Sequence, residues 1–269
     1  MKIQNIAAAS LLALAASNAN ATLLDLTPAN SSGTINGAIF TNLPIQPAGS
    51  GVIDSFVRIS TNNPTVQGYN TSTRPLSFDE NNSPIFTHDL LVNQLGIVTI
   101  GGMNYWKFLL DINQTNSDPL LQLDKLQLFM GNGDNGVPGL GLASLSDDQL
   151  IYDLDAGGNN AILLDYSLQS GSGASDMFAF IKVPTLTAAD LTKKITLYSL
   201  FGDNTSSNQN NDGFEEWARL SGDTSACIPT VANNFCGVTP PNPVPEPGVL
   251  ALLATALLGM GFKARGKKG

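Results

Sequence analysis

The stretch LLQLDKLQLFM, residues 120–130, decides the fold class of this chain of 269 residues. Its apolar residues recur at every second position in Leu126–Leu128, and the same period appears in the run ITLY, residues 195–198. A period of two places apolar side chains on one face of a β-strand. The sequence therefore predicts strands here, each with one face turned toward a core.

Similar short runs follow one another along the chain, separated by turn-rich segments. Asn-Asn, Gly-Gly, Asn-Gly and Pro-containing stretches supply the turns. The runs expected to form strands are Val52–Ile59, Ile97–Ile100, Tyr105–Ile112, Leu120–Met130, Leu150–Leu154, Ala161–Leu168, Asp176–Val183 and Lys194–Phe201. Short helical turns are expected at Asp147–Leu150 and Thr187–Leu191, the latter with Thr187 or Asp190 as its cap. Together these runs predict one all-β domain over residues 22–238, a single β-sandwich for which the jelly roll is one arrangement.

Composition narrows the classes of function. Charged residues make up 13% of the chain, against about 25% in an average soluble domain. Residues 22–245 hold 21 acidic and 8 basic side chains, a net charge of −13. Such a surface argues against nucleic acid as a partner. The hydrophobic content of 42% is sufficient for a packed core.

The first 21 residues have the pattern of a secretory signal peptide. Lys2 is followed by an Ala/Leu run through Ala16, and residues 19–21, Ala-Asn-Ala, form a small-x-small cleavage pattern. The apolar run is too short to span a bilayer comfortably. We expect cleavage before Thr22, which implies export.

The C-terminus has three parts in order. Residues 239–243 form a Pro/Asn-rich linker, residues 244–248 read VPEPG, and an apolar run over 248–262 precedes Lys263, Arg265, Lys267 and Lys268. The run makes about 22 Å of helix, less than the hydrocarbon core of about 30 Å. Lys263 can snorkel and the bilayer can thin. We expect a transmembrane helix over 248–262 with a cytoplasmic basic end, in preference to a buried core helix.

The string VPEPGVLALLATALLGMGFKARGKK resembles the PEP-CTERM sorting signal. The family combines a Pro-Glu-Pro motif, a short transmembrane helix and a basic terminus, and it occurs in Gram-negative bacteria that make extracellular polysaccharide. The resemblance implies that residues 244–269 are a sorting signal recognised by an exosortase, a membrane-embedded cysteine protease or transpeptidase. It assigns Pro245, Glu246 and Pro247 as the recognition motif. The implied location is the cell envelope, surface or extracellular matrix, after transient anchoring in the inner membrane.

Four blocks of the body also resemble segments of other PEP-CTERM proteins. They are DSFVRIS (54–60), QGYNTSTRPLSFDENNSPIFTHDLLV (67–92), WKFLLDINQ (106–114) and DGFEEWARL (212–220). The likeness implies a shared fold and export route and no particular activity.

Cys227 and Cys236 are the two cysteines. Because an exported chain meets an oxidising compartment, we expect a disulfide between them. A loop of this size gains on the order of 2–3 kcal/mol in the chain-entropy model. A metal-binding or reactive pair is the alternative, but zinc would need further Cys or His ligands.

One segment has oxygen ligands at alternate positions, as at the start of a Ca²⁺ loop. Its candidate ligands are Asn208, Asn210, Asp212, Glu215 and Glu216. Position twelve counted from Asn208 is Arg219, where an EF-hand needs Glu, so the EF-hand interpretation fails. An irregular Ca²⁺ site and a plain turn followed by an acidic strand both remain. No other cofactor is expected.

Signals for catalysis are weak. His88 is the only histidine, and no G-x-S-x-G motif occurs. GNGDNG, residues 131–136, matches G-x-G-x-x-G, but the following VPGLG cannot sustain the helix that a dinucleotide site needs. A pair of carboxylates for glycoside hydrolysis remains open. Trp106 and Trp217 could stack on sugars, although Trp106 lies in an apolar strand and is expected in the core.

The sequence therefore predicts a non-enzymatic exported protein with a structural or binding role near extracellular polysaccharide. A secreted carbohydrate-active enzyme and a Ca²⁺-dependent carbohydrate-binding module are the alternatives.

Overall fold

The computed structural model describes residues 21–42, 53–134, 139, 141–169, 175–203, 205–220, 228–230 and 233–235. The chain divides into a body that ends at Cys236 and a tail that begins at Gly237, and every described residue belongs to the body. Outside the described residues lie the predicted signal peptide except Ala21, both cysteines, the linker over 239–243, and the sorting signal with its predicted transmembrane helix.

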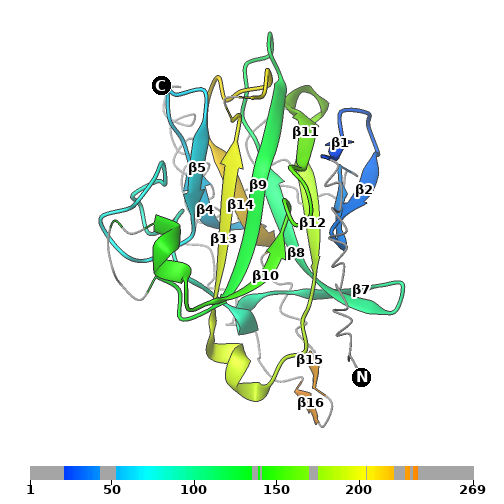
Figure 1. The fold of residues 1–269 in the computed structure, drawn as a ribbon, viewed down its shortest axis with the longest axis vertical. Coiled ribbons are helices and arrows are strands. Elements are labelled where there is room, and N and C mark those ends of the chain that lie inside the picture. The colour runs from blue at the N-terminus through cyan, green and yellow to red at the C-terminus, as the bar shows by residue number, and fades with distance from the viewer. Residues whose placement is uncertain are drawn as a thin grey trace, which may run out of the picture. The chain divides into compact units, whose positions relative to one another are not determined.

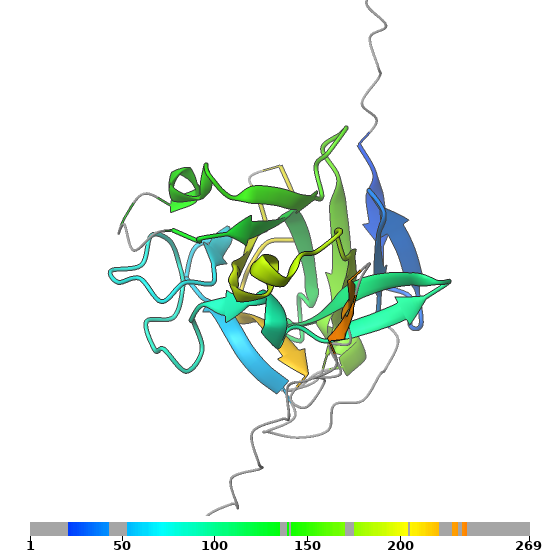
Figure 2. The same ribbon diagram turned by 90° about the horizontal axis from the view of Figure 1, so that it is seen from below.

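The described part of the body is built from β-strands in two large sheets (Figures 1 and 2). The first has the order β1-β11-β9-β13-β5, with β10 also paired to β9 and β6 also paired to β13. Its β1–β11 pair is parallel and its other pairs are antiparallel. Its strands are β1 (Leu23–Asp25), β5 (Val66–Tyr69), β6 (Leu90–Leu91), β9 (Leu120–Gly131), β10 (Gln149–Asp153), β11 (Ala161–Asp165) and β13 (Lys194–Phe201).

The second sheet has the order β2-β3-β12-β8-β14-β4, with β7 also paired to β8, and is entirely antiparallel. Its strands are β2 (Ser32–Ile35), β3 (Ala38–Thr41), β4 (Ile53–Ile59), β7 (Ile97–Ile100), β8 (Met103–Asp111), β12 (Met177–Lys182) and β14 (Glu215–Leu220). A separate ribbon pairs β15 (Ile228–Thr230) with β16 (Asn233–Phe235). The described helical segments are 3-10 turns: η1 (Val92–Gln94), η2 (Gly141–Leu145), η3 (Tyr166–Gln169) and η4 (Ala188–Thr192).

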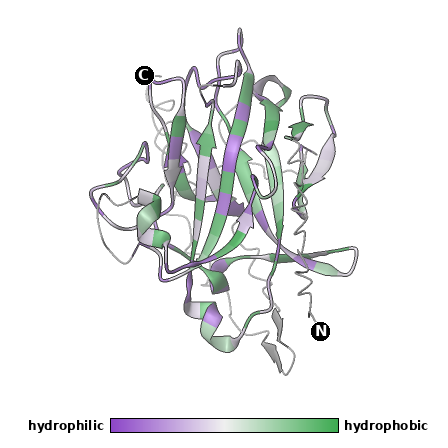
Figure 3. Cartoon of the chain, in the orientation of Figure 1, coloured by the Kyte–Doolittle hydropathy of each residue, from purple (hydrophilic) through white to green (hydrophobic). Residues whose placement is uncertain are grey.

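The main core lies between the two sheets. Alternating leucines of β9 join Trp106, Phe108 and Leu110 of β8 in one buried cluster, and the alternation of apolar and polar residues is visible along β9 in Figure 3. Each large side chain buried in this way contributes about 1.5–3 kcal/mol. The prediction of an all-β sandwich is confirmed.

Most predicted strands are confirmed within one or two residues at each end. The expected strand Ala161–Leu168 is wrong beyond Asp165, because that carboxylate accepts hydrogen bonds from Ser167 N and Oγ (2.8 and 2.6 Å) and the chain turns into η3. The expected helical turn at Asp147–Leu150 is also wrong, because Gln149 and Leu150 pair with β9. The turn at Thr187–Leu191 is confirmed as η4, where Asp190 Oδ2 accepts hydrogen bonds from Thr187 N and Oγ1 (both 2.7 Å).

Strand β1 begins at once after the predicted cleavage point. Thr22 N donates to Asn160 Oδ1 (2.9 Å), and Ala161 N donates to Thr22 O (2.9 Å). The following Leu26 is buried in the core. The chain is therefore part of the sheet from the first residue of the expected mature protein.

None of the helical segments in the described ranges is long and apolar enough to cross a membrane.

Candidate functional site

The four sequence blocks over residues 54–60, 67–92, 106–114 and 212–220 meet around strands β4, β8 and β14 of the second sheet. Strand β14 pairs with β4 on one side and with β8 on the other, so Glu216 lies opposite both Arg58 and Asp111. The segment before β6 runs along β4, where Ser55 Oγ donates to Phe86 O (3.3 Å). Sheet pairing thus brings together blocks that are far apart in the sequence.

Arg58 is the centre of this region. Its Nη2 and Nε atoms lie 2.6 and 3.0 Å from Glu216 Oε2, and its Cζ atom lies 3.5 Å from the ring centroid of Phe86 and 4.0 Å from that of Phe214. The side chain of Glu216 is only 4% exposed. A guanidinium over an aromatic ring gains cation–π attraction, which is stronger when the group is desolvated. The contact with Arg58 holds the ring of Phe214, the residue that follows Gly213 in the sequence.

Buried carboxylates surround the end of β8. Glu215 is fully buried, with Oε2 accepting from Asn113 N (3.0 Å) and Oε1 from Gln114 Nε2 (3.3 Å). Burial raises the pKa of Glu215 well above its usual range, and the nearby carboxylates of Asp176 and Asp111 raise it further. Because substrate cannot reach a fully buried carboxyl, Glu215 is poorly placed as a catalytic acid.

Asp176 shares this environment. Its Oδ2 accepts a hydrogen bond from Ile112 N (2.8 Å), whereas its buried Oδ1 has no hydrogen-bond partner in the described structure. Burial raises the pKa of Asp176 well above its ordinary value of 3.8, and the carboxylates of Asp111 and Asp165 add to the rise. The folded state therefore binds a proton here more tightly than the unfolded chain does.

We expect Asp176→Asn to raise the free energy of unfolding relative to the original protein, and to raise it more at neutral pH than at pH 4. A raised folded-state pKa gives stability that is present at or below the unfolded pKa near 3.8 and lost as pH rises through the folded pKa. The loss is about 1.4 kcal/mol for each pH unit that separates the two pKa values. The amide keeps the acceptor for Ile112 N and removes the charge. Urea unfolding from pH 4 to 8 measures the effect. Parallel curves for the variant and the original protein would contradict it.

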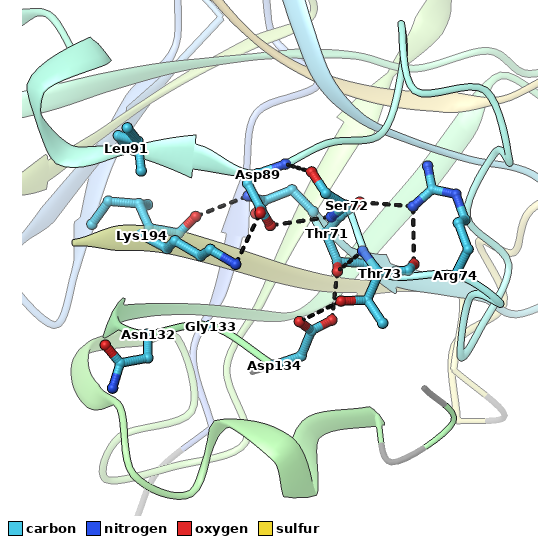
Figure 4. A network of polar contacts seen from close by, with 12 residues as sticks. Thr71, Ser72, Thr73, Arg74, Asp89, Leu91, Asn132, Gly133, Asp134 and Lys194 are labelled. Atoms are coloured by element: carbon cyan, nitrogen blue, oxygen red, sulfur yellow. Dashed lines mark hydrogen bonds and ion pairs between the residues drawn. The ribbon is translucent and has the colours of Figure 1, made fainter. Parts of the chain in front are cut away.

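A second polar network fastens the loop over residues 71–89 to the first sheet (Figure 4). The carboxylate of Asp134 accepts hydrogen bonds from the hydroxyls of Thr71 and Thr73, and Lys194 Nζ lies 2.9 Å from Asp89 Oδ2. Asp89 Oδ1 also accepts from Ser72 N (3.1 Å). These contacts tie the loop to β13 and to the turn after β9.

That turn begins the G-x-G-x-x-G match, and two amides in its described part are already occupied. Asn132 N and Gly133 N donate to the carboxylate of Asp148 at 2.7 and 2.9 Å. A phosphate at this position would meet a negative charge in place of open N–H groups. The interpretation as a turn, and not a dinucleotide site, is supported.

Both tryptophans belong to the core. Trp106 and Trp217 are fully buried, and Trp217 Nε1 donates to Ser199 Oγ (3.0 Å). The prediction for Trp106 is confirmed, and neither indole presents a face to a sugar. The single histidine, His88, donates its backbone N–H to Phe56 O (3.1 Å).

The candidate Ca²⁺ ligands are not brought to one point. Asn210 Nδ2 donates to Thr61 O (3.0 Å) and Asn63 O (2.8 Å), and Asp212 Oδ1 accepts from Gly213 N (2.8 Å). Glu215 and Glu216 are neighbours on a strand and point to opposite faces, the latter toward Arg58. Asn208 lies in the preceding turn, where its backbone N–H donates to Ser206 Oγ (3.0 Å). Within the described ranges, no three His, Cys, Asp or Glu side chains are placed to hold a metal ion.

The candidate binding site is a polar pocket of about 460 Å³ between two loops, here called the amide pocket. Ser60, Thr61 and Asn62 line one side, and residues 210–213 line the other. Ser60 Oγ, the Asn62 amide and Asp212 Oδ2 make no hydrogen bond to any other described residue. They are therefore available to a ligand.

A larger open pocket, about 600 Å³, is lined by the next residues of the same segment and is here called the sheet pocket. Asn63, Pro64 and Thr65 line it together with Gln67, Asp79 and Asp203. Sequence reasoning singled out Asn210 and Asp212 of the amide pocket, but as Ca²⁺ ligands, and it missed the residues over 60–65 because a loop carries no periodic signal.

Comparisons with known proteins identify the tail. The model of the PEP-CTERM protein-sorting motif matches residues 243–268, which confirms the resemblance of this segment. The motif indicates an exported protein that exosortase sorts to the cell envelope or surface. No curated protein matches the chain, and no solved structure does.

Proposed function

We propose that this protein is a non-enzymatic component of the cell surface or extracellular matrix, and that its body binds polysaccharide through the amide pocket. The sorting motif over residues 243–268 supports delivery to the place where such polymers accumulate. In this proposal, the helix over 248–262 holds the chain in the inner membrane until exosortase acts near Pro245–Pro247.

The observation that carries the binding role is the chemistry of the amide pocket. Hydroxyl, amide and carboxylate groups from Ser60, Asn62 and Asp212 meet there with unmade hydrogen bonds. Sugars present many hydroxyl groups that both donate and accept, so a pocket rich in planar polar side chains suits them.

The burial of acids and aromatics supports binding over catalysis. A glycosidase needs two carboxyl groups that reach the scissile bond. Glu215 is fully buried and Asp176 is 5% exposed, and both tryptophans lie in the core. The carboxylates of the amide and sheet pockets accept hydrogen bonds from neighbouring backbone, as expected for groups that bind and orient.

We expect the combined variant Ser60→Ala with Asn62→Ala to bind polysaccharide about tenfold more weakly, because two neutral hydrogen bonds are lost at about 0.5–1.5 kcal/mol each. Cosedimentation of the full-length protein with the producing bacterium's purified extracellular polysaccharide measures this. Asn82→Ala, an exposed asparagine outside the pocket, is the matched control. Absence of binding by the original protein, or equal binding by the pocket variant, would contradict the proposal.

Delivery has its own test. Replacing Pro245 and Glu246 by alanine should leave the chain unprocessed and retained with the inner membrane, because the recognition motif is gone. Immunoblots of fractionated cells report size and location together. Normal processing of this variant would count against sorting at the motif.

A further inference from the structure

One continuous segment contributes to both pockets: residues 60–62 line the amide pocket and residues 63–65 line the sheet pocket. Hydrogen bonds to neighbouring turns fix its position. Asn210 N donates to Pro64 O (2.9 Å), and Thr65 Oγ1 donates to Gly202 O (2.6 Å). A Cβ atom at Gly202 would lie 2.5 Å from Pro64 O, and φ there is +64°, so this close approach requires glycine. The two pockets therefore share one segment whose position is fixed.

Three carboxylates line the two pockets, and each has one oxygen unused. Asp212 Oδ1 accepts from Gly213 N, Asp79 Oδ2 accepts from Gln67 N, and Asp203 Oδ1 accepts from Thr205 and Ser206. The second oxygen of each receives no hydrogen bond from any described residue. Among the residues that the structure describes, no basic side chain lines either pocket.

The charge nearby is mostly negative. Hydrogen bonds from Thr205 are the main reason that the pKa of Asp203 is lowered, and the positive charge of Lys125 lowers it further. The surrounding chain, residues 22–245, has a net charge of −13. Charges within about 8 Å interact strongly at physiological salt. An anionic ligand in either pocket would lie beside the carboxylates that line it and be repelled by them.

We propose that the two pockets form one track for a polysaccharide whose sugars are uncharged or carry amino groups, and that the track rejects polymers of acidic sugars. This inference rests on the proposed function and names the chemical class of its ligand. A carboxylate oxygen accepts a strong hydrogen bond from a sugar hydroxyl or from an ammonium group. A uronate or sulfate on the polymer would instead meet Asp79, Asp203 and Asp212 and be repelled.

The experiment compares three defined polymers on the full-length protein in mild detergent at about 0.15 M salt, the physiological ionic strength: chitosan with free amino groups, neutral dextran, and alginate as a polyuronate. Biolayer interferometry gives the dissociation constants. We expect chitosan to bind most tightly, dextran more weakly, and alginate weakest of the three. The double variant Asp79→Asn with Asp212→Asn should weaken chitosan binding at least about tenfold, because two charge-assisted hydrogen bonds become neutral ones.

A matched control separates a site from general charge attraction. Asp147→Asn removes an exposed carboxylate that lies outside both pockets, and it should change chitosan binding less than twofold. If Asp147→Asn weakened chitosan binding as much as an Asp79→Asn single variant does, the proposed track would be overturned. Alginate binding as tight as chitosan would also overturn the inference while leaving polysaccharide binding intact. If none of the three polymers binds, and the bacterium's own polysaccharide does not bind either, the proposed function is overturned instead.

Discussion

Replacement of Trp217 by alanine is expected to lower the free energy of unfolding by about 3–5 kcal/mol, which is a large part of the stability of a typical domain. The indole is fully buried between the sheets, so its removal leaves a cavity that the rigid strands cannot fill. It also leaves Ser199 Oγ, on a buried residue of the opposite sheet, without its donor. Urea unfolding followed by the fluorescence of Trp106 measures the loss.

Trp217→Phe is the control for this prediction. The smaller ring keeps most of the packing and loses the hydrogen bond, so its effect should be clearly less than that of alanine. Similar losses for both variants would show that the hydrogen bond, and not packing, dominates at this position. A loss below about 1 kcal/mol for alanine would contradict the assignment of Trp217 to the core.

Removal of the Arg58 side chain is expected to cost about 3–5 kcal/mol, because a buried carboxylate then loses its counter-charge. Glu216 is 4% exposed and lies opposite Asp111 in the sheet, so Arg58→Ala leaves acidic side chains facing each other. The same change removes the contacts to Phe86 and Phe214. Thermal and urea unfolding of the full-length protein report the difference.

The cause can be isolated with a second substitution. If the orphaned charge dominates, Arg58→Ala combined with Glu216→Gln is more stable than Arg58→Ala alone. Arg58→Lys keeps the charge and loses the planar contacts to the rings, so it measures the stacking separately. A combined variant less stable than Arg58→Ala would refute the explanation by charge.

Sequence periodicity predicted the long strands well and the details of β9 poorly. In β9 the buried leucines change from positions 121 and 123 to 126 and 128, which breaks the strict period of two. The pairing with β13 shifts at this place, with Leu200 opposite Lys125 and Phe201 opposite Leu123. Such an irregularity inserts a residue into one strand. The leucine spacing shows where the period breaks, but which residues of β13 lie opposite depends on the pairing and is not readable from the sequence.

The short strands and the contact between Arg58 and Glu216 could not be predicted from the sequence, for a different reason. Strands β1, β2, β3, β5 and β6 have two to four residues each, too few to show a period. Arg58 looked like an ordinary charged residue and Glu216 like a candidate Ca²⁺ ligand, and only the pairing of β4 with β14 joins them. The contact between them exists only in the tertiary structure, where the two strands lie side by side.

The attachment of Thr22 to β11 sets a strict requirement on export. Trimming of even a few residues beyond Ala21 would remove β1, expose the Asn160 side chain and uncover the edge of β11. An open edge is a template for unwanted pairing with another chain. If the predicted signal peptide is removed, the position of cleavage therefore decides whether β1 or β11 forms this edge of the first sheet.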